Sequence, residues 1–184
     1  MANLIVISGD LAAGKSTLAA SLSEELKLVH LTKDSLKEIA CDAIGYSTRE
    51  ENRQLSIAAT DSMIYFFHQC ALVNQSLILE ANFRQDEMSR IKDIADEYHY
   101  NVLLIVLTGD INLLYQRFLD RMVNRHIAHR SLNLDYSIER FASYINEIRN
   151  QDLIYPAYTI DMSDLDEDEV TEKALELVHQ ELGI

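Results

Sequence analysis

Residues 9–16 read GDLAAGKS, which matches the spacing G-x-x-x-x-G-K-[ST]. Glycines at the two ends allow positive φ angles, so that successive backbone N–H groups can point at phosphate oxygens. A helix that begins directly after such a loop adds its positive N-terminal end to the same site. The side chains fit as well, because Lys15 can reach the β and γ phosphates and Ser16 offers a hydroxyl to Mg²⁺. The stretch therefore predicts a phosphate site for ATP and Mg²⁺, built from Gly9, Ala12, Ala13, Gly14, Lys15, Ser16 and Thr17.

The residues around the loop indicate a strand before it and a helix after it. Leu4 to Ile7 form a continuous apolar run, as in a strand buried on both faces. Leu18, Leu22 and Leu26 then recur at helical spacing. Further apolar runs predict four more strands, at 28–32, 76–80, 102–108 and 158–161.

Helical patterns separate these strands along the whole chain. They start near residues 15, 34, 85, 110, 138 and 167, and residues 48–74 form one long helix or two in succession. Alternating strands and helices predict an α/β, three-layer P-loop NTPase fold, with a five-stranded parallel sheet and helices on both faces. No stretch resembles a linker, so we expect residues 1–184 to form a single domain.

The composition narrows the classes of partner. The formal net charge of −14 disfavours nucleic acids and anionic membranes as partners. The longest apolar run is too short to span a bilayer, and the N-terminus lacks the basic segment of a signal peptide. Cys41 and Cys70 have neither metal-binding nor disulfide spacing, so we expect buried free thiols and a cytoplasmic protein. The oligomeric state cannot be read from the sequence.

Positive charge gathers in one region of this acidic chain. Between residues 115 and 130, only Asp120 accompanies the four arginines Arg117, Arg121, Arg125 and Arg130. Two interpretations remain open from charge alone, a specific anionic ligand or a solvated helix face with salt bridges. His126 and His129 lie three residues apart, but no third metal ligand is evident nearby.

Four segments together resemble one group of known enzymes. GDLAAGKST, KDSLKE, EANFR and RFLDRMVNRHIAHR, within Ile5 to about Asp161, are similar to small P-loop kinases of the branch with zeta toxins, chloramphenicol phosphotransferase, polynucleotide kinase and AAA-type kinases. Only the first segment is highly specific. The loop departs from the usual pattern, because Leu11-Ala12-Ala13 stands where a Pro-Gly pair is common.

The resemblance implies roles for residues outside the loop. In the resembled kinases, an aspartate at the place of Asp34 accepts the proton of the acceptor hydroxyl. Asp34 or Ser35 could instead cap a helix. Glu80, at the end of the third predicted strand, could position Mg²⁺ or contact the acceptor, or it could form a salt bridge at the strand end. Lys37 and Arg84 could contact the acceptor, Lys37 through an anionic part of it, or they could be solvated surface residues. In the resembled kinases, arginines at this place belong to a lid over ATP, so we expect a lid at about residues 115–135. Arg117 and Arg121 would contact the nucleotide, and Arg121 and Arg125 would stabilise the transferred phosphate.

The leading hypothesis is an ATP-dependent kinase that transfers the γ-phosphate to a hydroxyl of a small-molecule acceptor. One alternative is an NTPase or switch protein without an acceptor, and another is a non-catalytic nucleotide-binding module. A kinase acting on a nucleic-acid end or a nucleotide sugar also remains possible. Asp34 and the arginine cluster favour the first hypothesis.

Overall fold

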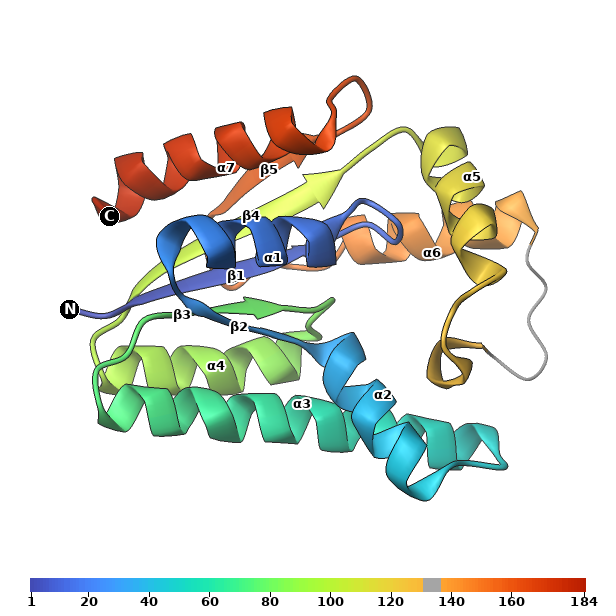
Figure 1. Cartoon of the computed structure of the whole chain (residues 1–184), viewed down its shortest axis with the longest axis horizontal. Helices are drawn as coiled ribbons and strands as arrows, with labels where there is room; N and C mark the ends of the chain where they lie inside the picture. The colour runs from blue at the N-terminus through green and yellow to red at the C-terminus, as the bar shows by residue number, and fades with distance from the viewer. Residues whose placement is uncertain (131–136) are drawn as a thin grey trace.

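The computed structural model describes residues 1–130 and 137–184 of the chain. Five strands alternate with helices along it (Figure 1). The strands are β1 (Asn3–Gly9), β2 (Val29–Thr32), β3 (Leu77–Glu80), β4 (Asn101–Thr108) and β5 (Ala157–Asp161). The α-helices are α1 (Lys15–Leu26), α2 (Lys33–Ile44), α3 (Arg49–Leu72), α4 (Gln85–Glu97), α5 (Ile111–Met122), α6 (Ile138–Arg149) and α7 (Glu167–Leu182), with a short 3₁₀ helix η1 (Ile127–His129).

All five strands join one sheet in the order β2-β3-β1-β4-β5, and every neighbouring pair is parallel. The predicted five-stranded parallel sheet is therefore confirmed. In such a sheet, the strands end at one edge, where ligands bind beyond their carboxyl ends. The β1 loop, the start of α2 and the end of β3 meet at this edge, while α5 and α6 lie towards the same end of the molecule (Figure 1).

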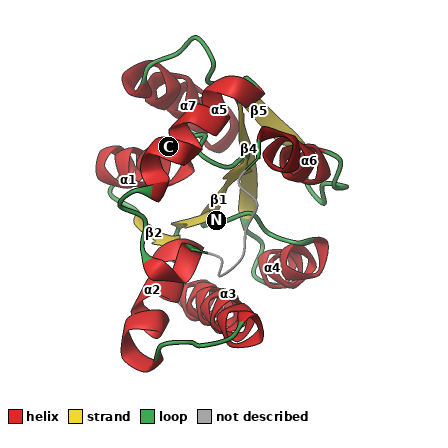
Figure 2. Ribbon diagram, turned by 90° about the vertical axis from the view of Figure 1, so that its right-hand side faces the viewer, coloured by secondary structure: helices red, strands yellow, loops and turns green. Residues whose placement is uncertain are grey.

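Helices cover both faces of the sheet (Figure 2). The alternation of side chains along β1 decides which face each residue joins. Ile5 and Ile7 pack in the cluster that contains residues of α1 and α7, whereas Leu4 and Val6 pack in the cluster that contains residues of α3 and α4. Because β1 is buried on both faces, its sequence is apolar without interruption.

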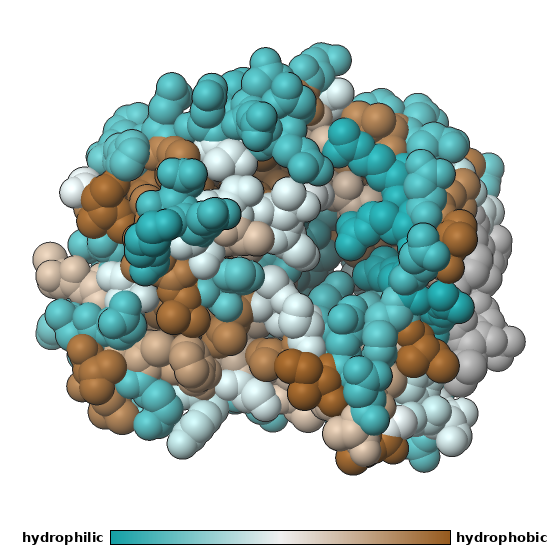
Figure 3. Space-filling model, in the orientation of Figure 1, coloured by the Kyte–Doolittle hydropathy of each residue, from teal (hydrophilic) through white to brown (hydrophobic). Residues whose placement is uncertain are grey.

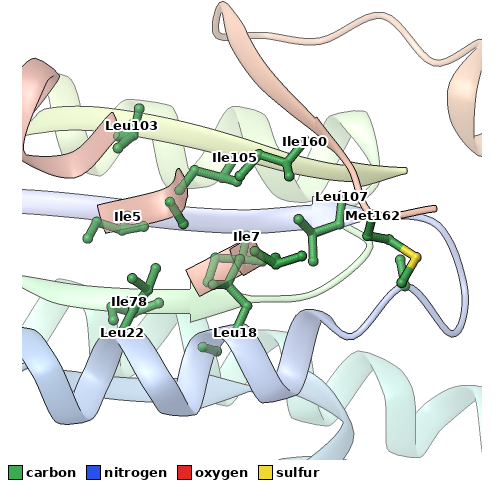
Figure 4. Close-up of a cluster of buried hydrophobic side chains, with 14 of the residues drawn as sticks. Ile5, Ile7, Leu18, Leu22, Ile78, Leu103, Ile105, Leu107, Ile160 and Met162 are labelled. Atoms are coloured by element: carbon green, nitrogen blue, oxygen red, sulfur yellow. The ribbon is translucent and has the colours of Figure 1, made fainter. Parts of the chain in front are cut away.

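The core beneath α1 is drawn in Figure 4. Leu18 and Leu22 of α1 lie against side chains of β1, β3 and β4 there, and both leucines are at most 2% exposed. Cys41 and Cys70 are buried and free, as expected. Across the described part of the chain, no helix is both long and apolar enough to cross a bilayer.

The structure corrects one helix boundary and decides between two alternatives for another segment. Thr32, rather than Asp34 or Ser35, caps α2, because its hydroxyl accepts the backbone N–H of Ser35. Asp34 lies in the first turn and is free of the capping role. Residues 48–74 hold a single helix, which starts at a reciprocal capping box formed by Thr48 and Glu51.

The predicted lid, residues 115–135, is only partly described. Residues 115–122 continue α5, and Arg125 follows the end of that helix instead of continuing it by one turn. The 3₁₀ helix η1 occupies residues 127–129. Residues 131–135 of the expected lid lie outside the described residues.

Gly9 is the position at which the β1–β4 pairing leaves no room for a side chain. Its φ angle is 126°, and a Cβ atom there would lie 2.1 Å from the backbone oxygen of Leu107. We predict that Gly9→Ala lowers the free energy of unfolding by about 3 kcal/mol or more, at the upper end of overpacking effects. Denaturant titration measures this loss.

The matched control is Gly183→Ala. Gly183 also has a positive φ angle, but its Cβ atom would meet nothing within 4 Å. The control should lose only about 1 kcal/mol for the left-handed backbone. Equal losses in the two variants would contradict the steric explanation.

Candidate functional site

The loop between β1 and α1 has the backbone of an anion-binding nest. Gly9, Ala12 and Gly14 adopt φ angles of 126°, 62° and 86°. Ala12 thus takes a left-handed conformation without being a glycine, which costs about 1 kcal/mol. Gly14 is the N-cap residue of α1, and no side chain accepts a hydrogen bond from the first turn. The first N–H groups of the helix therefore remain available to an anion. Ala13 is buried in the loop, and Thr17 is exposed on the first turn of α1.

Lys15 folds back over the same loop. Its Nζ atom donates hydrogen bonds to the carbonyl oxygens of Gly9, at 3.1 Å, and of Asp10, at 2.6 Å. Burial lowers the pKa of the Lys15 ammonium from its ordinary value, and the carboxylate of Glu80 is the largest influence opposing that shift. Positive charge is thereby held at the loop, beside the N-terminus of α1.

Ser16 and Glu80 come together although they lie far apart in the sequence. The Ser16 hydroxyl donates to Glu80 Oε2 at 3.0 Å, across from α1 to the end of β3. Burial raises the pKa of Glu80, while Lys15 and the hydrogen bond from Ser16 oppose the rise. The pair presents hydroxyl and carboxylate oxygens beside the loop, which are ligands that Mg²⁺ prefers. The residues present therefore fit a magnesium ion.

Asp34 faces a cavity of about 730 Å³, lined by Ser16, Asp34, Arg121, Arg125 and His129 among others. The Asp34 carboxylate accepts from Arg125 Nη2 at 3.4 Å and lies 3.7 Å from His129 Nδ1. Viewed as in Figure 3, the molecular surface is hollowed to the right of centre, with hydrophilic residues around the hollow. The structure thus brings the predicted acceptor-side carboxylate and the phosphate loop to one cavity.

The four arginines of the cluster occupy different places. Arg117 donates to the Met162 sulfur at 3.5 Å, in a small recess beside Ala13, Gly14 and Leu165. Arg121 and Arg125 line the cavity of Asp34. Arg130 instead donates to the backbone carbonyls of Arg125 and Val123, and thus holds the chain that follows α5.

The two histidines of this region contact carboxylates. His126 Nε2 lies 3.0 Å from Asp42 Oδ1, and His129 Nε2 lies 2.9 Å from Glu38 Oε1. Burial lowers the pKa of His129, and the negative charge of Asp34 makes the largest contribution in the opposite direction. Within the described residues, no group of three or more His, Cys, Asp or Glu side chains could hold a metal ion.

Lys37 and Arg84, predicted on the acceptor side, line a second and larger cavity of about 900 Å³. Arg125 and His129 line both cavities, which places the two beside each other. Glu80 lines neither cavity and instead contacts Ser16. The predicted acceptor residues are thus divided between the two cavities and the Ser16–Glu80 pair.

The sequence analysis missed one ion pair within the site. Asp10, inside the loop, is 0% exposed, and its carboxylate accepts from Arg149 Nη2 at 2.5 Å. Arg149, the last residue of α6, also donates to the carbonyl of Gly109 at 2.6 Å, and the Gly109 N–H donates to Asp10 at 3.2 Å. The sequence signal for this pair was an acidic residue, Asp10, inside the phosphate loop. Its partner could not be identified from the sequence, because 139 residues separate the two.

Loss of this partner would leave a buried charge uncompensated. We predict that Arg149→Met lowers the free energy of unfolding by about 3 kcal/mol, the lower end for breaking a buried pair, because Arg149 is one-third exposed. Urea titration measures the change. The double variant Asp10→Asn/Arg149→Met removes the stranded charge and should recover part of the loss. Additive losses in the double variant would contradict the coupling.

Comparison with known proteins agrees with this geometry. A family model described as an AAA domain matches residues 4–142, which include the phosphate loop and the arginine cluster. No match is found among curated proteins. A solved structure from Chloroflexus aurantiacus J-10-fl, whose assignment as a kinase is provisional, is 27% identical, with a TM-score of 0.83 and 98% of each chain covered.

Two further solved structures share the fold at low identity. A gluconokinase from Sinorhizobium meliloti 1021 is 13% identical, with a TM-score of 0.63, over 98% of this chain and 94% of its own. A shikimate kinase from Aquifex aeolicus VF5 is 16% identical, with a TM-score of 0.58, over 98% of this chain and 99% of its own. The family match covers most of the chain, and the structural relatives named here carry kinase descriptions on the same fold. The chain belongs to the AAA domain family, with the fold of P-loop kinases.

Proposed function

We propose that this protein is an ATP-dependent kinase that transfers the γ-phosphate to a hydroxyl of a small-molecule acceptor. The observation that carries the proposal is the shared cavity of Ser16, Asp34 and Arg121. A bare nucleotide switch needs the loop and its magnesium ligands, whereas a kinase also needs a base and phosphate ligands beside an open acceptor cavity, as Asp34, Arg121 and Arg125 would supply. The resemblance to the zeta-toxin and chloramphenicol phosphotransferase branch supports the same activity.

The nucleotide side of the proposal rests on the loop. The N–H groups of residues 12–17 and the Lys15 ammonium would bind the β and γ phosphates of ATP. Arg117 and the segment at Met162–Leu165 border the recess beside Ala13 and Gly14, which suits the nucleoside end. Ser16 and Glu80 would hold Mg²⁺, which neutralises charge on the phosphates when it is bound.

The acceptor side of the proposal rests on Asp34. The acceptor oxygen forms a bond to the γ phosphorus, the bond from that phosphorus to the β–γ bridging oxygen breaks, and ADP leaves. Asp34 takes the proton of the acceptor hydroxyl. Arg121 and Arg125 would stabilise the charge on the equatorial oxygens of the transferred group. Asp34 already contacts Arg125, so the base and a phosphate ligand are adjacent.

The expected setting follows from composition. We propose a cytoplasmic enzyme, a setting supported by two buried free thiols, with a small acceptor rather than a nucleic acid. A net charge of −14 would repel a long polyanion before it reached the site.

Removal of the Lys15 ammonium tests the nucleotide side. We predict that Lys15→Ala weakens binding of Mg²⁺·ATP at least tenfold or abolishes turnover, because the main positive charge at the loop is lost. Isothermal titration and an ADP-release assay measure the two effects. The control Lys92→Ala removes a surface ammonium paired with Asp96 and should change neither. Wild-type ATP affinity and turnover in Lys15→Ala would disprove a nucleotide role for this loop.

Asp34→Asn tests the acceptor side. We predict that phosphotransfer falls at least about a hundredfold, because a general base typically contributes 10²–10⁴ in rate, while ATP affinity stays close to wild type. Steady-state kinetics with an identified acceptor measure the change.

The control for Asp34 is Thr32→Ala. Thr32 caps α2, so this variant should lose about 1 kcal/mol of stability and keep its rate. Near wild-type turnover in Asp34→Asn would leave Asp34 without a catalytic role.

A further inference from the structure

The larger cavity, beside Asp34, concentrates positive charge in an acidic protein. Its lining contains seven lysines and arginines and one acidic residue, Glu50, out of 16 basic and 30 acidic residues in the whole chain. The basic residues are Lys37, Arg49, Arg53, Arg84, Arg125, Arg130 and Arg140. The sign of the charge in this cavity is thus the reverse of that of the whole chain.

Three of these seven charges are engaged by the protein itself. Arg53 pairs with Glu50 at 2.7 Å, and Arg125 contacts Asp34 at 3.4 Å. Arg130 donates to two backbone carbonyls. The other four basic side chains, at positions 37, 49, 84 and 140, form no ion pair or side-chain hydrogen bond with any described residue.

Lys37 is the most informative of the four. It is 9% exposed, and burial lowers the pKa of its ammonium; the carboxylate of Asp34 opposes the shift, whereas Lys33 and Arg125 add to it. A buried ammonium without an ion-pair partner is costly, and its natural compensation is a bound anion. Lys37 follows Asp34 by three residues, so both lie on the same side of α2.

The remaining charges reach the cavity from separate elements. Arg49 begins α3, Arg84 precedes α4 and Arg140 lies in the first turn of α6. Aromatic side chains of Tyr46, Phe118, Phe141 and Tyr144 also line the cavity. About 900 Å³ is within the size range of small-molecule sites, and arginine suits phosphate or carboxylate because its planar fork binds such oxygens in pairs.

We propose that the phosphoryl acceptor carries an anionic group, a phosphate or a carboxylate, in addition to its reacting hydroxyl. This group binds in the larger cavity to Lys37, Arg49, Arg84 and Arg140. The reacting hydroxyl lies in the adjacent cavity, at Asp34. The proposal rests on the kinase function proposed above, whose acceptor it specifies. The basic cavity then selects anionic alcohols over neutral ones, which leave the buried Lys37 ammonium without a counter-charge.

The first experiment measures anion binding without turnover. The phosphate loop is saturated with Mg²⁺ and a non-hydrolysable ATP analogue, and inorganic phosphate is titrated while the melting temperature is followed. Phosphate should stabilise the wild type, and Arg140→Gln and Lys37→Met should weaken its binding about tenfold or more. The control Arg90→Gln, on the surface beside Asp61, should bind phosphate like the wild type. Equal phosphate binding in all variants, or none in the wild type, would overturn the inference.

Lys37→Met also separates ligand binding from a structural role. The ligand-free variant should melt at or above the wild-type temperature, because an unpaired buried charge is removed, yet it should bind phosphate less well. A loss of both stability and affinity would assign Lys37 a structural role and count against the inference.

The second experiment screens acceptors by ADP release. Hydroxylated metabolites are tested in sets that share a carbon skeleton and differ only in a neutral, carboxylate or phosphate group, for example glucose, glucuronate and glucose 6-phosphate. Turnover should occur with anionic members, and Arg140→Gln should raise KM at least tenfold with little change in kcat. The carboxylate and phosphate arms identify which anion is used, while a neutral best acceptor would overturn the inference.

The two proposals fail in different ways. If the wild type neither binds Mg²⁺·ATP nor turns it over, the kinase function fails whatever the cavity binds. If ATP is turned over with neutral alcohols, the kinase function stands and the anionic acceptor is excluded.

Discussion

The buried carboxylate of Asp10 is the constraint on which the site depends. It lies inside the phosphate loop, where an unpaired charge would be costly, and it is compensated by Arg149 and the Gly109 N–H. These contacts join the loop to the end of β4 and to the last turn of α6. Because α6 also carries Arg140 and Tyr144, the same ion pair connects the phosphate loop to the wall of the larger cavity.

A second buried carboxylate holds together the helices that supply other residues of that cavity. Glu87 of α4 is 8% exposed and accepts from Lys33 of α2 at 3.0 Å and Thr60 of α3 at 3.0 Å. Three helices are thereby held together around one charge. The positions of Lys37, Arg49 and Arg84, which come from these helices or their ends, follow from this packing. The carboxylates of Asp10 and Glu87 are thus two satisfied buried charges that hold the elements around the cavities in place.

Charge in this chain acts at two ranges. The net charge of −14 acts at long range, where it repels polyanions. The cavity beside Asp34 reverses that sign locally, and short-range pairing to a small anion is little affected by distant screened charges. The proposed selection of small anionic acceptors would combine these two ranges, because a small anion can reach the basic side chains without the long-range repulsion that a polyanion meets.

The sequence alone determined the loop, the five parallel strands and the helices between them, because these depend on local backbone geometry and on burial patterns within a few residues. Tertiary structure decided the Asp10–Arg149 pair, the capping of α2 by Thr32 in place of Asp34, and the contact between Ser16 and Glu80. It also decided that basic residues from positions 37 to 140 share one cavity. Such side chains meet only after the order of strands and the packing of helices are established, and no local pattern carries that information.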